Sequence, residues 1–441
     1  MLSPVLIVGA GTWGCSIALH LARRGYTSIT VLDSSPVPSP TSAGNDLNKI
    51  AEEAREPKDE DSDEDYFWNK TTQIAMKAWK EDPLFSPLYH PMGFIMAAVG
   101  DEAYEKCIAY AESEGILLTP LKSKEDFQTT MPKGVLTGDF PGWRGFWKKS
   151  GAGWVSASAT LRAMHDEASN LGVQFITGSP VTSLIYSSSR DSILGARTAD
   201  DKDHLAGITI LSAGAGSDAL LDFKKQLRPT AWTLAHLPLT PSEAKLYLNL
   251  PVLYGVDRGF FIEPSHSPGS AHELKICDEH PGYINPILSP SSGEVIGSRP
   301  FAKEQVPLSS SSRIRSLLSE TMPHLAGREF SFARICWDAD TIDRTFLIDK
   351  HPELNGLVVV VGGSGNGFAT APAIGVVVAD LIEDKLDSRL KKAMRWRPEI
   401  AEERDWWDTQ DRFGGEGKVM DFRDVREWTS IGEDESKETE T

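Results

Sequence analysis

The chain has 441 residues, of which 40% are hydrophobic and 24% charged, a composition that excludes a mostly disordered, collagen-like or coiled-coil protein. Its 45 Lys and Arg against 63 Asp and Glu give a formal charge of -18 at pH 7, which disfavours unspecific attraction to nucleic acid or to anionic membranes. A chain of this length suggests about two to four domain-sized units. We therefore expect a globular protein whose partner is a small molecule.

The cysteines and the ends of the chain give no sign of secretion or of a metal site. The four cysteines form no CxxC pair, so neither a disulfide framework nor a zinc site is expected. The apolar start of the chain lacks a basic n-region and breaks into glycines, which favours a buried strand over a signal peptide. No other segment is apolar enough to cross a bilayer, and the last residues form no peroxisomal tripeptide. We expect a cytoplasmic location, and a monomer without membrane contacts.

The first 33 residues predict a βαβ unit. Residues 5–8 form a continuous apolar run, residues 9–14 a glycine-rich turn, and residues 15–24 a segment with helical periodicity. Residues 29–32 then form a second strand that ends at Asp33. A nucleotide-binding sheet typically begins in this way.

The following segments continue an alternation of helices and strands. Residues 52–65 are dominated by Glu, Asp and Lys and have no apolar face, so we predict a solvated loop inserted into the fold. Helices with short strands, including residues 93–96, are expected as far as residue 131. A helix at 156–171 and strands at 173–177, 181–186 and 208–211 then return the chain to the first sheet.

The second half favours a different sheet. Between residues 230 and 337 strand-like segments such as 259–262 and 274–277 follow one another, which indicates an antiparallel sheet in a second domain. The apolar strand 357–361, a glycine-rich turn and the helix 374–382 then predict a final return to the first sheet.

The turn at residues 9–14 has the dinucleotide-binding pattern GxGxxG. Its glycines allow a tight turn and close approach of a pyrophosphate, which the free N–H groups at the helix start stabilise. Asp33 lies where a ribose hydroxyl would be bound, although a glycine-rich turn that only packs a helix remains the alternative. The candidate cofactor-binding residues of this unit are Gly9, Gly11, Thr12, Trp13, Gly14 and Asp33.

The motif alone does not decide between FAD and NAD. Two further glycine-rich segments, 213–216 and 362–367, each follow a strand, and such dispersed contacts favour FAD. An NAD dehydrogenase would usually confine its cofactor to one contiguous domain. The further cofactor-binding candidates are Val181, Gly214, Gly365, Gly367 and Phe368.

Several segments resemble the fungal fructosyl amino acid oxidases (amadoriases) of the monomeric sarcosine oxidase superfamily. They include LIVGAGTWGCSIALHLARRGY, SAGNDLNKI, ELKICDEHPGY, FSFARICWDADT and GGSGNGF, and the match spans nearly the whole chain. The resemblance implies an FAD-dependent oxidase that converts the C1–N bond of a fructosyl amino acid to an imine. Hydrolysis would give glucosone and the amino acid, and oxygen would be reduced to hydrogen peroxide.

The resemblance also implies that FAD is attached covalently to Cys336, as an 8α-thioether. Arg334, Cys336 and Asp338 alternate onto one face of a strand, and a neighbouring cation favours the thiolate that such a bond needs. A buried structural role is the alternative for any cysteine. We keep that interpretation for Cys15, Cys107 and Cys277.

For Lys275 the resemblance implies a place over the flavin N5, where its charge would serve the reaction with oxygen. The alternative is a lysine of an edge strand that turns to solvent. In SAGNDLNKI the resemblance places Ser42 near the pyrophosphate and Lys49 near the isoalloxazine, and it groups Asp46 with them. Asp46 and Lys49 could equally form a local salt bridge of little energetic weight.

Glu279 and Arg412 resemble the residues that hold the amino acid part of the substrate, with Arg412 as a fork for its carboxylate. Surface roles are the alternative for both. Many relatives carry a carboxylate-binding lysine after Gly-Phe in the last glycine loop, whereas this chain has Ala369. His280 lies beside Glu279, but the histidines lack the spacing of a metal site.

The expected fold class is α/β, with a Rossmann-like FAD-binding domain of the glutathione reductase or D-amino acid oxidase type and an α+β substrate domain on an antiparallel sheet. We assign 1–50, 150–225 and 335–390 to the first domain, and 51–149 and 226–334 to the second. Residues 391–441 would be an extension that reaches the active site and ends in a mobile tail.

Three other functions stay open at this point. The first is an oxidase of N-methyl or cyclic amino acids, and the second is an NAD-dependent dehydrogenase. The third is a catalytically silent flavoprotein that binds glycated peptides.

Overall fold

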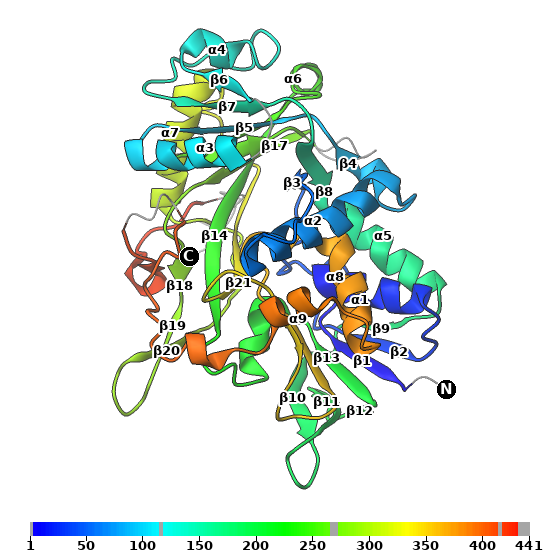
Figure 1. Cartoon of the computed structure of the whole chain (residues 1–441). Helices are drawn as coiled ribbons and strands as arrows, with labels where there is room; N and C mark the ends of the chain where they lie inside the picture. The colour runs from blue at the N-terminus through cyan, green and yellow to red at the C-terminus, as the bar shows by residue number, and fades with distance from the viewer. Residues whose placement is uncertain (1–2, 114–117, 265–271, 413–416, 431–441) are drawn as a thin grey trace, which may run out of the picture.

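The structure of the chain, a computed structural model, describes residues 3–113, 118–264, 272–412 and 417–430. The end of the chain, residues 431–441, where the mobile tail was predicted, lies outside the described residues. Figure 1 shows a helix-covered sheet in the lower part of the molecule and a second sheet in the upper part, with the long strand β14 running between them. The expected α/β class is confirmed.

The lower sheet is parallel in the order β22-β23-β13-β1-β2-β9, except that β22 pairs antiparallel with β23. Its central strands are buried on both faces, as the apolar runs predict. Helices α1 and α8 pack together against it, and α5 and α2 flank them (Figure 1). The elements are β1 Val5–Val8, α1 Thr12–Arg23, β2 Ile29–Leu32, α2 Asp63–Glu81, α5 Ala157–Asn170, β9 Gln174–Ile176, β13 Ile208–Leu211, β22 Leu347–Lys350, β23 Leu357–Val361 and α8 Ala371–Ile382.

The upper sheet has the order β24-β18-β14-β17-β16-β15-β5-β7-β6, and β21 pairs with β14. It is antiparallel as predicted, except that β15 and β18 pair in parallel with β5 and β24. Helices α3 and α7 pack against its strands. The elements are β5 Phe94–Ala98, α3 Asp101–Ser113, β6 Thr119–Leu121, α4 Lys124–Gln128, β7 Arg144–Lys148, β14 Leu227–Pro238, α6 Pro241–Leu246, β15 Val252–Gly255, β16 Gly259–Ile262, β17 Glu273–Asp278, β18 Tyr283–Ile284, α7 Leu308–Thr321, β21 Phe332–Thr341 and β24 Met420–Asp421.

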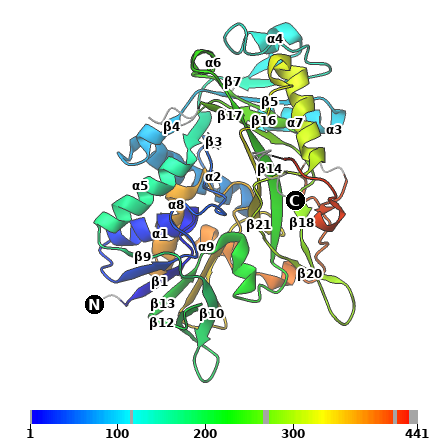
Figure 2. The ribbon, with the colours of Figure 1, turned by 180° about the vertical axis from the view of Figure 1, so that it is seen from behind.

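Smaller sheets connect or extend these two. Strands β3 (Asn48–Glu52), β8 (Ala152–Ser156) and β4 (Tyr89–His90) form a three-stranded sheet, and β19 (Pro286–Leu288) and β20 (Val295–Ser298) form a hairpin. The prediction that 181–186 joins the nucleotide-binding sheet is wrong. This strand, β10 (Val181–Tyr186), forms a separate antiparallel sheet with β11 (Ile193–Thr198) and β12 (Asp203–Leu205), visible at the bottom of Figure 2.

The acidic segment 52–65 is only in part the solvated loop that we predicted. Its last residues form the first turn of α2, where Ser62 caps the helix by accepting a 3.0 Å hydrogen bond from the Asp65 amide. Acidic side chains are favoured there by the helix dipole. Asp63 also pairs with Lys392 of helix α9 (Ser388–Met394) at 2.5 Å. The segment therefore attaches α2 to α9.

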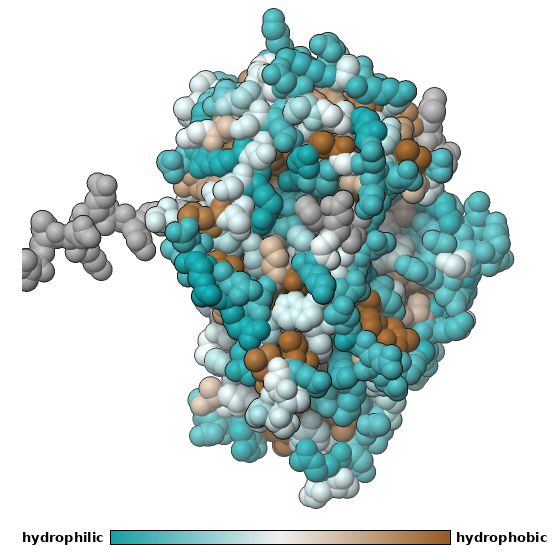
Figure 3. Space-filling view, turned by 90° about the vertical axis from the view of Figure 1, so that its left-hand side faces the viewer, coloured by the Kyte–Doolittle hydropathy of each residue, from teal (hydrophilic) through white to brown (hydrophobic). Residues whose placement is uncertain are grey.

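The face of the molecule in Figure 3 is mostly hydrophilic, and its apolar residues lie in small separate groups. Among the residues that the structure describes, none of the helices combines the length and the apolar character that a membrane crossing requires.

Candidate active site

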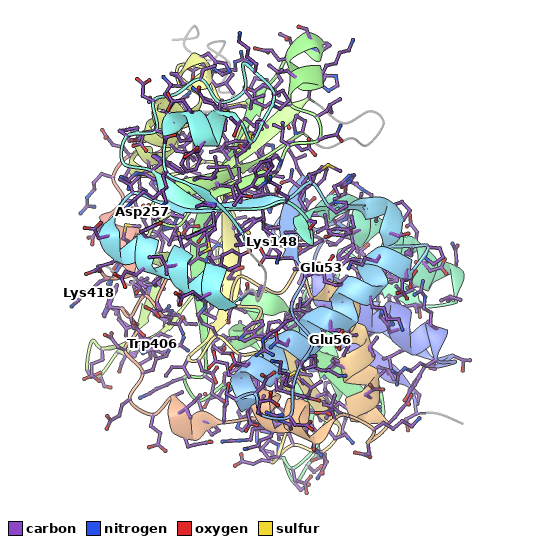
Figure 4. All side chains as sticks on the ribbon, turned by 45° about the horizontal axis from the view of Figure 1, so that its top comes forward. Glu53, Glu56, Lys148, Asp257, Trp406 and Lys418 are labelled. Carbon is purple, nitrogen blue, oxygen red and sulfur yellow. The ribbon has the colours of Figure 1, made fainter. Side chains whose placement is uncertain are left out.

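A cavity of about 1300 Å³ is lined by residues from both sheets. Glu53 lines this cavity and lies close to Lys148, near α2 and the upper sheet (Figure 4), and the Lys148 Nζ donates to the Glu53 carbonyl oxygen at 3.3 Å. Of the predicted site residues, Gly14 and Asp46 lie behind the lining. The lining itself includes Gly9, Gly11, Thr12, Trp13, Asp33, Ser42, Lys49, Val181, Gly214, Lys275, Glu279, Cys336, Gly365, Gly367, Phe368 and Arg412.

The glycine-rich turn between β1 and α1 forms one end of this cavity. Gly9 has a positive φ of 107°, and a β-carbon there would overlap the Ser212 carbonyl group, while one at Gly14 would overlap the Gly9 carbonyl. At Gly11 the nearest atom to such a carbon, the Ser42 Oγ, is 3.7 Å away, so this position is open toward the cavity. No side chain caps α1. Its first amides are free to bind an anionic group.

Two other segments meet this turn. Asp33 at the end of β2 accepts hydrogen bonds from the amides of Ala10, at 2.8 Å, and Ser35, at 2.9 Å. The Trp13 indole donates to the Gly367 carbonyl oxygen at 2.7 Å and so ties the first glycine turn to the last one. The Ser212 hydroxyl is buried and finds no partner among the described residues. The long cavity, its open glycines and this unsatisfied hydroxyl fit an extended dinucleotide such as FAD.

Lys275 lies in the middle of the cavity wall and is 1% exposed. Its strand, β17, lies between β14 and β16, so the alternative of an edge lysine turned to solvent is wrong. Its Nζ donates to the Asp46 carboxylate at 2.5 Å and to the Asn48 carbonyl oxygen at 2.8 Å. Burial lowers the pKa of Lys275, whereas the Asp46 charge opposes this shift.

Asp46 is shared between two lysines, since Lys49 approaches the same carboxylate at 2.7 Å. Burial would raise the pKa of Asp46, but Lys275 and Lys49 together hold it well below its usual range. The side chain of Asp46 has no exposed surface, so this pair is more than the weak surface bridge that the sequence left possible. It fixes two ammonium groups beside one cavity.

Cys336 lies on β21, opposite Trp232 of β14, and also lines the cavity. Its neighbour Arg334, on the same face, donates to the carbonyl oxygens of Pro40 at 2.8 Å and Ser42 at 3.3 Å. Arg334 therefore positions the loop that carries Ser42, a role that the strand pattern alone did not reveal.

The other end of the cavity is formed by partly buried charged side chains. The Arg412 guanidinium donates to Asp340 at 2.8 Å, lies 3.8 Å from Asp338 and stacks over the Trp232 ring at 4.5 Å. Glu279 faces the same space. Burial and the nearby Asp278 raise the pKa of Glu279 to about 8, so that it is mostly protonated at neutral pH.

His280 has a structural role. Its Nδ1 accepts from the Gly282 amide at 2.9 Å, its Nε2 lies 3.0 Å from the Thr233 hydroxyl, and its ring stacks on Trp232. Burial lowers the pKa of His280 to about 4, so it is neutral at pH 7. No cluster of three potential ligands for a metal ion occurs within the described ranges.

Sequence reasoning missed several residues at this end. Tyr254, Trp232 and Arg344 line the cavity near Glu279 and Arg412, and each comes from a different segment. Only Arg344 carries a local signal, because it follows a strand in the polar turn DTIDRT. Ala369 also lines the cavity, and its carbonyl oxygen accepts a 2.7 Å hydrogen bond from the Trp79 indole.

Comparisons with known proteins agree with this geometry. The family described as FAD dependent oxidoreductase matches residues 4–381. The chain is 27% identical to L-saccharopine oxidase of Schizosaccharomyces pombe, over 90% of this chain and 94% of that protein. Amadoriase I from Aspergillus fumigatus, a fructosyl amine:oxygen oxidoreductase, is 52% identical with a TM-score of 0.93, over 98% of both chains. Amadoriase II from the same fungus, in complex with FSA, is 48% identical with a TM-score of 0.91, over 97% of both. The chain therefore belongs to the FAD-dependent oxidoreductase family.

Proposed function

We propose that the protein is an FAD-dependent oxidase of fructosyl amino acids. It would oxidise the C1–N bond to an imine, which water hydrolyses to glucosone and the free amino acid, while oxygen becomes hydrogen peroxide. The observation that carries this proposal is one cavity with an open glycine cradle at one end and with buried Lys275 and partly buried Glu279 and Arg412 farther along. The identity of about one half to the amadoriases over nearly the whole chain supports it.

The glycine turns at Gly9–Gly14 and around Gly214 and Gly365 would hold the cofactor, together with Asp33. FAD, when bound, supplies the two-electron acceptor for the amine and the site at which oxygen is reduced. The residues of the chain bind and orient the substrate and exclude water from it. Arg412 offers a guanidinium to the carboxylate, and Glu279, as a neutral acid, can donate a hydrogen bond to the substrate.

Lys275 would place a positive charge where oxygen acquires negative charge. Such a charge is most effective when it is fixed before the reaction. Asp46 and the Asn48 carbonyl oxygen fix the Lys275 ammonium in this way. No strong protein base is required if the amine binds in its neutral form.

We also propose that FAD is attached to Cys336. Its place on the cavity wall and the match of FARICW to the amadoriase pattern support this. Acid-precipitated wild-type protein should stay yellow, and Cys336→Ser should release its flavin. Cys277→Ser is the matched control, because Cys277 lines the same cavity and should leave the attachment intact. Complete release of flavin from the wild type on precipitation would contradict the proposal.

A panel of amines tests the function itself. Fructosyl-valine and fructosyl-lysine should release hydrogen peroxide, and sarcosine, pipecolate and saccharopine should release far less. The likeness to L-saccharopine oxidase makes N-alkyl amino acids the second candidate, which peroxide release from those compounds alone would favour. A silent flavoprotein would release none from any of them, and the NAD-dependent dehydrogenase is wrong because the family is flavin-dependent.

The domain boundaries, the monomeric state and the cytoplasmic location remain part of the proposal. The strands of the parallel sheet all fall within 1–50, 150–225 and 335–390, which supports that division. Light scattering on the purified protein and fluorescence of a tagged chain in cells would test the other two.

A further inference from the structure

Arg344 is an arginine of the cavity wall that has no hydrogen-bond or ion-pair partner among the described residues. Its Nε is buried and unsatisfied, and no hydrogen bond or ion pair of its guanidinium exists within the described part of the chain. It lines the same cavity as Glu279 and Arg412. A buried charge that is left unpaired is costly. A guanidinium kept in this state is therefore suited to a ligand rather than to the fold.

The backbone at Arg344 is also unusual, with a φ of 61° in the left-handed region. The turn is held firmly in place. Arg397 binds the Asp343 carboxylate at 2.8 and 2.9 Å, and the Thr341 hydroxyl donates to the Thr345 carbonyl oxygen at 2.7 Å. Such a conformation is unfavourable for an arginine and persists only where the surrounding structure holds it. The fold thus presents Arg344 to the cavity in advance of binding.

The second arginine at this end of the cavity, Arg412, already uses part of its guanidinium for a hydrogen bond within the protein. One of its terminal nitrogens donates to Asp340 at 2.8 Å, while its Nε is buried without a partner in the described residues. Burial lowers the pKa of Arg344, and the nearby Arg412 charge lowers it further. The two cations are therefore neighbours. The Asp340 and Asp338 charges oppose the shift, but no carboxylate of the described residues lies at ion-pair distance from Arg344. An incoming anion would satisfy both.

We propose that Arg344 and Arg412 together bind the substrate carboxylate, and that Arg344 supplies a guanidinium that no carboxylate in the described ranges occupies. The inference rests on the proposed function and narrows its substrates to glycated compounds that carry a carboxylate. Ala369, which lines the cavity but carries no charge, cannot supply this cation. A planar fork also fits a carboxylate better than a lysine would.

Two ligands that the enzyme cannot oxidise separate charge recognition from other effects. One is the thioether analogue of fructosyl-glycine, in which sulfur replaces nitrogen, and the other is its carboxamide, which lacks the charge. Arg344→Asn is the informative variant, since asparagine tolerates a left-handed backbone. Arg190→Asn is the matched control, because Arg190 has a φ of 59° but lies exposed on the β10–β11 turn over Tyr186.

Calorimetric titration of the flavin-loaded proteins measures their affinities for the two ligands. Wild type and Arg190→Asn should prefer the carboxylate, and Arg344→Asn should bind it about 10- to 50-fold more weakly, as expected for loss of a charge-assisted pair. Its affinity for the carboxamide should change by less than about twofold. Arg344→Lys keeps the charge but not the planar fork, so its affinity for the carboxylate ligand should be roughly three- to tenfold weaker.

Three outcomes would overturn the inference. Equal losses for both ligands in Arg344→Asn would assign Arg344 a structural role. An undiminished preference for the carboxylate in that variant, or in Arg344→Lys if the first does not fold, would remove Arg344 from the site and leave the proposed function standing. A wild type that binds neither ligand would instead contradict the proposed function, and the inference with it.

Discussion

The two ends of the cavity are built from different parts of the polypeptide. At the dinucleotide end the wall is mostly backbone, contributed by the turn Gly9–Gly14 and by the turn around Gly214. At the substrate end the wall includes partly buried charged side chains, among them Glu279 and Arg412. The dinucleotide end depends on glycines that leave space beside the backbone. The substrate end depends on the balance of charge among its side chains. Substitutions should therefore act through shape at one end and through electrostatics at the other.

The largest effect is expected where the two ends meet, at Lys275. Lys275→Met should slow flavin reoxidation by oxygen at least about 100-fold, roughly 3 kcal/mol in barrier, because the charge that stabilises reduced oxygen is lost. Stopped-flow mixing of reduced enzyme with oxygen measures this step, and anaerobic reduction by substrate should change less. Lys49→Met is the matched comparison, since Lys49 shares Asp46 and should matter less to oxygen. Equal slowing of both half-reactions would remove Lys275 from the oxygen reaction.

At the backbone end, two glycines of one motif should fail in different ways. Gly14→Ala would overlap the Gly9 carbonyl, so we expect a loss of stability of a few kcal/mol, on the order of that for an overpacked core. Gly11→Ala meets no protein atom closer than 3.7 Å, so the flavin-free protein should keep its Tm while its flavin content falls. Thermal unfolding and flavin absorbance read out the two effects. Similar losses of Tm in both variants would contradict this distinction.

At the charged end, Arg412→Ala should raise KM for carboxylated fructosyl amino acids about 10- to 100-fold, since a bidentate pair contributes roughly 1.5–3 kcal/mol. The limiting kcat should fall less than kcat/KM, because binding energy common to ground and transition state is lost. Ala369→Lys should in turn strengthen the binding of substrates whose carboxylate lies near the glycated nitrogen. Steady-state kinetics on preparations with matched flavin content measure this effect. An unchanged KM for every such substrate would exclude Arg412 from binding the carboxylate.

The smallest effect concerns pH and Glu279. Its pKa in the folded protein, about 8, exceeds its ordinary value of 4.5, so its contribution to stability is fully present below pH 4.5 and is lost as the pH rises through 8. Ionisation above pH 8 also adds a negative charge beside Arg412, so KM should rise roughly three- to tenfold between pH 7 and 9. Glu279→Gln should flatten both profiles. A KM profile that is unaltered in this variant would assign the titration to another group.

The same contrast explains what could be predicted from the sequence. The unit β1–α1–β2 and its glycine pattern are local, and spacing alone placed them correctly. Lys275 and Asp46 are 229 residues apart, so their pairing depends on how β17 meets the loop before β3, and a strand pattern cannot show this. For the same reason the sequence left an edge position open for Lys275. Arg344 was missed because its significance lies in the partner that it lacks in the part of the chain that the structure describes.

Anaerobic mixing of the purified, flavin-containing protein with fructosyl-valine tests the central claim most directly. The account predicts that the yellow colour bleaches as the flavin is reduced, that sarcosine bleaches it far more slowly, and that admitted oxygen restores the colour with one equivalent of hydrogen peroxide. A flavin that stays oxidised with fructosyl-valine and fructosyl-lysine, yet bleaches with sarcosine, would contradict the account.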